Sequence, residues 1–197
     1  MRIVRFAGVM LGLALFCTVS STHAQVPPGV YQPDRGPVEI GVGYQYQHYS
    51  GVVGRSFHDH GYNADVSLHI FDFITGVNAR LAVQAEGTAA VGFGHANGTP
   101  RVVANSLFLG GGPRMSIVSR GRIEPWIHVL PGWQHFRFTQ TATLGTASAF
   151  GFMAGGGVDF RLGGQLFWRV QGDYIGTHFQ SNLQSNYSVG SGVAFYF

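Results

Sequence analysis

Residues 38–47 read VEIGVGYQYQ, and this stretch decides the fold class because two kinds of residue alternate strictly along it. One set is apolar or aromatic: Val38, Ile40, Val42, Tyr44 and Tyr46. The other set is polar or glycine: Glu39, Gly41, Gly43, Gln45 and Gln47. Since successive side chains of a β-strand point to opposite faces, one face of this strand suits lipid and the other suits water.

The same alternation recurs along the chain in segments of about ten residues, which is typical of transmembrane β-strands. The predicted strands are residues 38–47, 62–70, 81–88, 106–116, 124–136, 150–161, 167–175 and 186–197. Beyond the N-terminal segment there is no apolar run long enough for a helical membrane span. We therefore predict an all-β fold, a closed antiparallel up-and-down transmembrane β-barrel of about eight strands.

Connector lengths predict the orientation of the barrel. Three connectors are tight: residues 71–76 (FDFITG), 118–122 (VSRGR) and 161–165 (RLGGQ). Four are long and polar: residues 50–60, 92–101, 137–149 and 176–185. Short and long connectors alternate, as periplasmic turns and extracellular loops do in such barrels. Both ends of the barrel domain are then periplasmic.

Composition agrees with a membrane barrel and narrows the possible partners. Hydrophobic residues make up 45% of the chain and charged residues only 11%, against roughly 25% charged residues in soluble domains. The 30 glycines and the 14% aromatic content suit closely spaced strands and membrane interfaces. The chain contains no lysine, so nucleic acid is not an expected partner.

The N-terminus has the pattern of a secretory signal peptide. Arg2 and Arg5 precede the apolar run of residues 6–19, and Ala24 ends a short segment of small residues. We predict a cleaved signal peptide over residues 1–24, a proline-rich periplasmic lead-in over residues 25–37 and the barrel over residues 38–197. The lone cysteine, Cys17, lies in the signal, so the mature chain has neither a disulfide nor a thiol nucleophile.

Aromatic residues on the lipid face predict two interfacial girdles, and the last strand must close against the first because open sheet edges are not tolerated in lipid. The periplasmic girdle contains Trp168, Phe195 and Phe197. The outer girdle contains Tyr46, Trp133, Phe150 and Tyr174, and Tyr44 belongs to the same aromatic set.

Two features resemble a known class of protein. Val193, Phe195 and Phe197 alternate up to a terminal phenylalanine, which resembles the assembly signal that the barrel-insertion machinery reads in bacterial outer-membrane proteins. FLGGGPRMS, RIEPWIHVLPG, GGGVDFRL and WRVQGDYIGTHF resemble the small porin-like, OmpA-type barrel domain, the opacity-protein-like family. The resemblance covers residues 38–197 and implies a bacterial outer-membrane location. We expect a monomer in contact with membrane lipid and lipopolysaccharide.

The inward positions carry a set of ionisable side chains of both signs. These are Glu39, Asp65, Arg80, Glu86, Arg114, Glu124, His128, Asp159, Arg169 and Asp173. An eight-stranded barrel is only wide enough for side chains to fill it, and charges with little water must pair. The prediction is a plug of paired charges, and the alternatives are a gated ion path or catalytic carboxylates.

Other candidate sites are weaker. His58, Asp59 and His60, with His48 nearby, could form a surface zinc or copper site, but one short cluster lacks the separated ligand pairs of a zinc motif, and a solvated polar loop is the simpler interpretation. His48 and Ser50 have a spacing similar to that of outer-membrane lipid A deacylases, where an asparagine follows the serine instead of glycine. An interfacial position for His48 is the simpler interpretation. We therefore expect no metal, no cofactor and no catalytic residue.

The sequence thus predicts an integral outer-membrane protein, not an enzyme, with a structural or surface-interaction role in adhesion or envelope integrity. The arginines predicted in outer loops, Arg55, Arg101 and Arg137, could contact anionic lipopolysaccharide, although exposed arginines are usually only solvated. The alternatives are a lipid-modifying enzyme similar to lipid A deacylases and a narrow small-solute channel.

Overall fold

The structure is a computed structural model that describes residues 35–52, 55–75, 77–95, 102–118, 122–139, 145–179 and 182–197. The predicted signal peptide, residues 1–24, and residues 25–34 of the predicted lead-in lie outside these ranges. The part of the chain that is described contains no helix long and apolar enough to cross a membrane.

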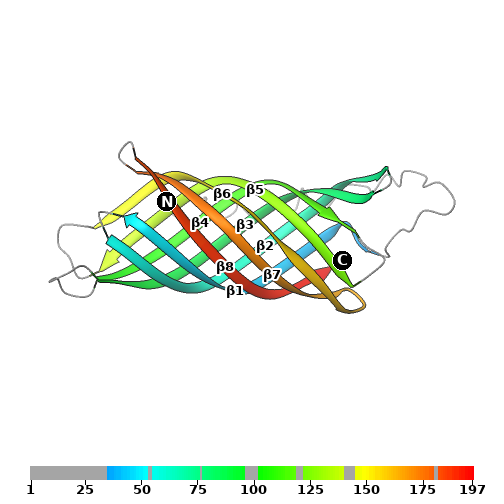
Figure 1. Cartoon of the computed structure of the whole chain (residues 1–197), viewed down its shortest axis with the longest axis horizontal. Helices are drawn as coiled ribbons and strands as arrows, with labels where there is room; N and C mark the ends of the chain where they lie inside the picture. The colour runs from blue at the N-terminus through cyan, green and yellow to red at the C-terminus, as the bar shows by residue number, and fades with distance from the viewer. Residues whose placement is uncertain are drawn as a thin grey trace, which may run out of the picture. The chain divides into compact units, whose positions relative to one another are not determined.

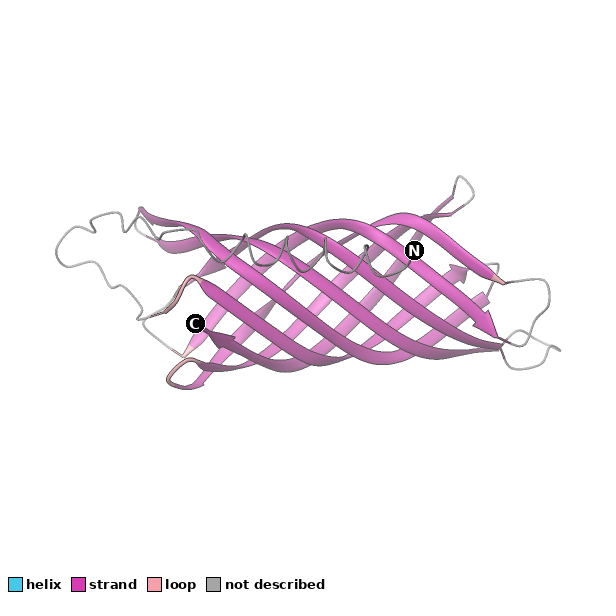
Figure 2. Ribbon diagram, turned by 180° about the vertical axis from the view of Figure 1, so that it is seen from behind, coloured by secondary structure: helices cyan, strands magenta, loops and turns pink. Residues whose placement is uncertain are grey.

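Eight antiparallel strands form one closed barrel in which each strand pairs with its neighbours in chain order (Figure 1). The strands are β1 (Val38–Val52), β2 (Arg55–Thr75), β3 (Val77–His95), β4 (Val102–Ile117), β5 (Ile123–Thr139), β6 (Thr146–Gly163), β7 (Leu166–Phe179) and β8 (Asn182–Tyr196). The predicted up-and-down β-barrel is confirmed, and the view from behind shows the same continuous wall of strands (Figure 2).

The predicted period of two separates the lumen from the lipid face. In β5, Trp126 and His128 are buried, whereas the intervening Ile127 and the following Val129 are exposed. This is the reverse of a soluble core, since the exposed face of each strand is the apolar one. The outer face of the wall is therefore apolar, and the polar and charged side chains of the strands point into the lumen.

Closure joins the two ends of the sheet. β1 pairs with β8 from Glu39 opposite Tyr196 to His48 opposite Tyr187. At the seam, the Phe197 amide donates to the Val38 carbonyl at 2.8 Å, and the Val38 amide donates to the Phe197 carbonyl at 3.3 Å. Over these described residues the sheet is closed, as predicted from the cost of unpaired backbone groups in lipid.

The predicted bounds of the four long loops are wrong, because strands occupy much of these stretches. Strand structure continues through residues 50–52 and 55–60, and through residues 92–95, 137–139, 146–149, 176–179 and 182–185. The remaining loop residues, 53–54, 96–101, 140–144 and 180–181, lie outside the described part. Strand pairing rests on backbone hydrogen bonds, so it continues where polar side chains make the sequence resemble a loop.

At the opposite end of the barrel, the described residues include the whole β6–β7 turn. The β6–β7 turn contains Gly164 at φ +54°, a left-handed conformation that glycine adopts without a Cβ penalty. In β2 the register shifts between His69 and Phe71, so Ile70 and Phe71 are both exposed. Irregularities of this kind are common at barrel rims.

Orientation can be tested with cysteines at the two ends of β6. Thr146 and Gln165 are both exposed, at the loop end and in the β6–β7 turn respectively. We expect Thr146→Cys to be labelled by an impermeant maleimide on intact cells and Gln165→Cys to be labelled only after the outer membrane is permeabilised. Labelling of Gln165→Cys on intact cells would reverse the predicted orientation.

The C-terminal residue offers a second test. Phe197 is exposed on the seam between β8 and β1, so Phe197→Asp places a charge in an apolar girdle and removes the terminal aromatic of the predicted assembly signal. We expect less heat-modifiable, folded protein in the outer membrane, with Phe197→Tyr as the conservative control. Equal amounts of folded protein from both variants would contradict the assembly role.

Candidate functional site

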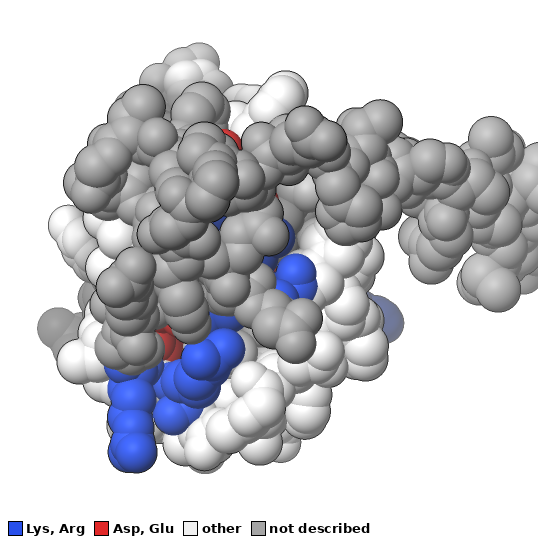
Figure 3. Space-filling view, turned by 90° about the vertical axis from the view of Figure 1, so that its right-hand side faces the viewer, with Lys and Arg blue, Asp and Glu red and all other residues white. Residues whose placement is uncertain are grey.

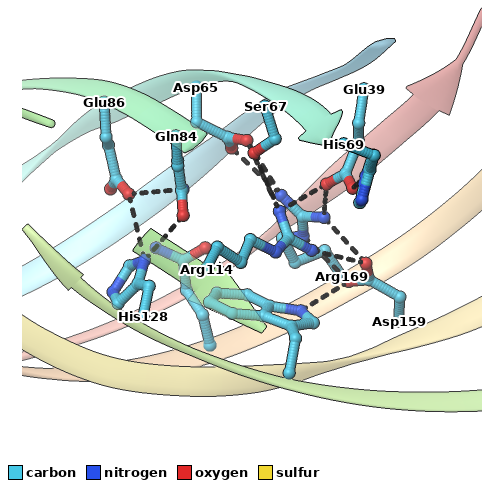
Figure 4. A network of polar contacts seen from close by, with 12 residues as sticks. Glu39, Asp65, Ser67, His69, Gln84, Glu86, Arg114, His128, Asp159 and Arg169 are labelled. Atoms are coloured by element: carbon cyan, nitrogen blue, oxygen red, sulfur yellow. Dashed lines mark hydrogen bonds and ion pairs between the residues drawn. The ribbon is translucent and has the colours of Figure 1, made fainter. Parts of the chain in front are cut away.

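The structure places all ten predicted lumen residues inside the barrel, where each is buried. Five of them form a central cluster that we call the lumen cluster: Glu39, Asp65, Arg114, Asp159 and Arg169 (Figure 4). They come from β1, β2, β4, β6 and β7, so the cluster links strands on opposite sides of the wall.

Arg169 is the most connected member of the lumen cluster. Its Nε donates to Asp159 Oδ1 at 2.8 Å and its Nη2 donates to Asp159 Oδ2 at 2.7 Å, a two-pronged contact. Its Nη1 donates to Asp65 Oδ1 at 3.0 Å, and Nη2 also contacts Glu39. Bidentate guanidinium–carboxylate contacts are among the stronger and more directional polar interactions in proteins.

Arg114 makes a second bridge through the same acids. Its Nη2 donates to Asp159 Oδ2 at 3.2 Å, and its Nη1 donates to Glu39. The Arg114 side chain has no exposed surface. Two guanidinium groups thus face three carboxylates, so every charge in the lumen cluster has a partner of opposite sign.

Trp126 and His69 complete this layer. Trp126 Nε1 donates to Asp159 Oδ1 at 3.0 Å, and the Arg114 Cζ lies 4.2 Å from the centre of the indole ring. His69 Nε2 lies 3.2 Å from Glu39 Oε2. Sequence analysis missed both residues, although each shares the inward parity of a predicted neighbour. That parity was the available signal.

A second polar group lies around His128. Its Nδ1 is 3.0 Å from Gln84 Oε1, and its Nε2 is 3.0 Å from Asp173 Oδ1. Gln84 Nε2 donates to Glu86 Oε2 at 3.2 Å. Ser188 Oγ donates to Asp173 Oδ2 at 3.1 Å. Among three further predicted residues, Gln84 links Glu86 to His128, and His128 contacts Asp173 directly.

Arg80 and Glu124 do not join the lumen cluster. Arg80 Nε donates to Asp72 at 2.8 Å, and the Asp72 side chain is about half exposed, which indicates a rim position. Glu124 pairs with Arg35, whose guanidinium also lies 4.6 Å from the Phe167 ring centre. Arg35 precedes the first strand, so the alternation of residues along the strands could not predict its contact with Glu124.

Apolar layers also fill the lumen, and sequence analysis did not predict them. One consists of Phe108, Leu130, Met153 and Ile175. Another consists of Tyr49, Phe57, Ala104, Phe136 and Phe138, of which Phe57 and Phe138 lie in stretches that were predicted as loops. The lumen is therefore packed by rings and aliphatic groups as well as by ion pairs.

The predicted girdle residues face outward. Tyr44, Trp133, Phe150, Trp168, Phe195 and Phe197 are exposed, while Tyr46, Tyr174 and Val193 are partly buried. Trp133 lies opposite Phe150 across β5 and β6, and Trp168 stacks on Phe160 with ring centres 5.2 Å apart. Seen from the β6–β7 end of the barrel, several arginine side chains lie together on the surface (Figure 3). Arg122, which directly precedes β5, is exposed.

The segment His58-Asp59-His60 is part of β2, so its prediction as a loop is wrong. Asp59 is buried in the lumen, whereas His58 and His60 are exposed on the outside. Ser50 lies in β1 beyond His48, and nothing is described of its side chain. Within the described ranges, no group of three or more His, Cys, Asp or Glu side chains is arranged to hold a metal ion.

The family described as outer membrane protein beta-barrel domain matches residues 11–197. The chain belongs to this family. Comparison with curated protein sequences gives no match.

Solved structures share the fold at low sequence identity. Neisserial surface protein A superposes with a TM-score of 0.62 at 11% identity, covering 84% of this chain and 100% of that one. Ail of Yersinia pestis gives 0.52 at 10% identity, with 82% and 99% covered. OprG of Pseudomonas aeruginosa gives 0.52 at 8% identity, with 83% and 97% covered. At these identities the likeness establishes the outer-membrane barrel fold.

The lumen cluster yields a stability prediction. Arg114→Ala removes one guanidinium from a fully buried site beside Glu39 and Asp159. We expect the free energy of unfolding in urea to fall by about 3–5 kcal/mol, because an incompletely compensated buried charge remains. Arg122→Ala, at an exposed position, is the control and should change it by less than about 0.5 kcal/mol. Equal stability of the two variants would show that the lumen charges are solvated.

Proposed function

We propose that the protein is a monomeric barrel of the bacterial outer membrane with a structural or surface-interaction role, in envelope integrity or adhesion, and that its lumen is closed. The observation that carries this proposal is the lumen cluster. Arg114 and Arg169 hold carboxylates from β1, β2 and β6 across the interior. A pathway through the barrel would have to break these buried ion pairs.

Packing around the cluster supports a closed lumen. Asn63 and Gln171 beside the cluster are buried, as are Asp65 and Arg169 within it. The apolar layer of Phe108, Leu130, Met153 and Ile175 occupies the same lumen. A channel for small solutes needs a continuous polar path, and these two features interrupt one.

The surface role rests on the outer parts of the strands. β1 and β2 continue beyond the aromatic belt as a paired hairpin from His48 opposite His58 to Val52 opposite Arg55. Ail, one of the proteins that share the fold, is described as an attachment invasion locus protein.

Lipopolysaccharide is the proposed neighbour of the β1–β2 hairpin, and the barrel-assembly machinery is the proposed partner of the Phe197 terminus. Delivery to the membrane is proposed to use cleavage of residues 1–24 as a signal peptide.

We propose that the protein is not an enzyme. A lipid A deacylase-like mechanism uses a histidine that activates a serine, usually with the histidine oriented by an acid. Here the His48 imidazole faces His58, at 3.4 Å between their Nδ1 atoms, and not a carboxylate. Asp59, which follows His58 in the chain, points into the lumen on the other face of the wall.

Conductance distinguishes the closed barrel from the channel. Refolded, unmodified protein in a planar bilayer should show little or no current, because the ion pairs and apolar layers fill the lumen. A pore would instead conduct small ions, with a selectivity that Arg114→Ala alters. Protein-free detergent is the control. Steady ohmic current from the unmodified protein would overturn the closed-barrel proposal.

A further inference from the structure

Two histidines from adjacent strands face each other on the outside of the barrel. His48 of β1 and His58 of β2 are register partners, and their rings lie with centres 4.7 Å apart. Their Nδ1 atoms are separated by 3.4 Å. His58 is exposed and His48 is partly exposed, so both ring edges can be reached from outside the barrel.

This separation matches the geometry of two ligands on one metal ion. Zinc–imidazole bonds are about 2.0–2.1 Å long, and tetrahedral coordination therefore places two ligand nitrogens about 3.3–3.4 Å apart. Neutral imidazole nitrogens are favoured ligands of zinc and of copper(II). We propose that His48 and His58 form a two-histidine site for a divalent transition metal of this class.

The surroundings leave room for other ligands. Two imidazoles supply only half of a tetrahedral set, so water or an oxygen of a neighbouring molecule must complete it. Tyr46 Oη lies 2.5 Å from His58 Nδ1, so the phenol must rotate away or join the ligands when a metal binds. His60 Nδ1 instead contacts the Tyr44 hydroxyl, and Asp59 lies in the lumen.

The site has a defined structural consequence. His48 and His58 lie closer to the loop end of the β1–β2 hairpin than the Tyr44–Tyr62 pair does. Directly beyond them, the register of the hairpin shifts between Tyr49 and Val52. A metal held by both strands would fix their pairing just before this irregularity. It would do so on the outer face, independently of the lumen.

Copper(II) is the probe of choice, because it binds nitrogen sites more tightly than the other divalent first-row metals do and reports the number of ligand nitrogens by electron paramagnetic resonance. The refolded protein must carry no histidine tag. We expect saturable binding of one copper(II) per barrel by calorimetry, with hyperfine structure from two nitrogens. Zinc should compete for the site.

Single variants test the assignment. His48→Ala and His58→Ala should each weaken copper(II) binding by about tenfold or more, since even removal of residues that only support a metal ligand costs about 10- to 100-fold. Each should also reduce the hyperfine pattern to one nitrogen. Heat-modifiability on gels establishes that each variant is folded.

Two other outward histidines serve as matched controls. His60 lies on the same strand and face as His58, and His135 hydrogen-bonds Ser148 across β5 and β6. His60→Ala and His135→Ala should leave affinity and nitrogen count unchanged. Unchanged binding in folded His48→Ala or His58→Ala would overturn the site, as would an equal loss in His60→Ala.

Discussion

Backbone hydrogen bonding in lipid is the constraint on which the rest of this structure depends. A membrane offers no water to an open sheet edge, so β8 must pair with β1, and the terminal residue Phe197 exchanges backbone hydrogen bonds with Val38. Closure gives every strand one lipid face and one lumen face. The strict alternation of residues 38–47 is the sequence counterpart of that division.

A closed barrel of eight strands leaves a narrow interior, and this explains the arrangement of its charges. Arg114 and Arg169 share the carboxylates of Glu39 and Asp159, so neither guanidinium depends on one partner. Removing one charged side chain from such a set lowers the stability of the fold by more than the whole set contributes to it, because the remaining charges stay buried without a partner. The lumen cluster therefore favours one closed arrangement of the wall over partly opened ones.

Parity along the sequence predicted ten ionisable side chains that the structure buries in the lumen, but it did not predict which of them meet. Trp126 and His69 share the parity of the predicted residues and could have been included on that ground. The guanidinium partners of Glu39 are 75 and 130 positions away, at Arg114 and Arg169, and their meeting depends on the stagger of the strands around the barrel. Arg35 lies before the first strand, so alternation carries no information about its contact with Glu124.

The alternation of side chains between the two faces of a strand also decides how a candidate site can be recognised in a β-barrel. Three consecutive residues, His58-Asp59-His60, look like one ligand cluster in the sequence, yet the strand sends Asp59 inward and the two histidines outward. The residue that completes a pair with His58 is its register partner His48. Because side chains fill the described lumen, solvent-accessible chemistry in this barrel belongs on the outer rim, between neighbouring strands. A contiguous motif is therefore weaker support for a site in a β-barrel than two residues of matching parity on adjacent strands.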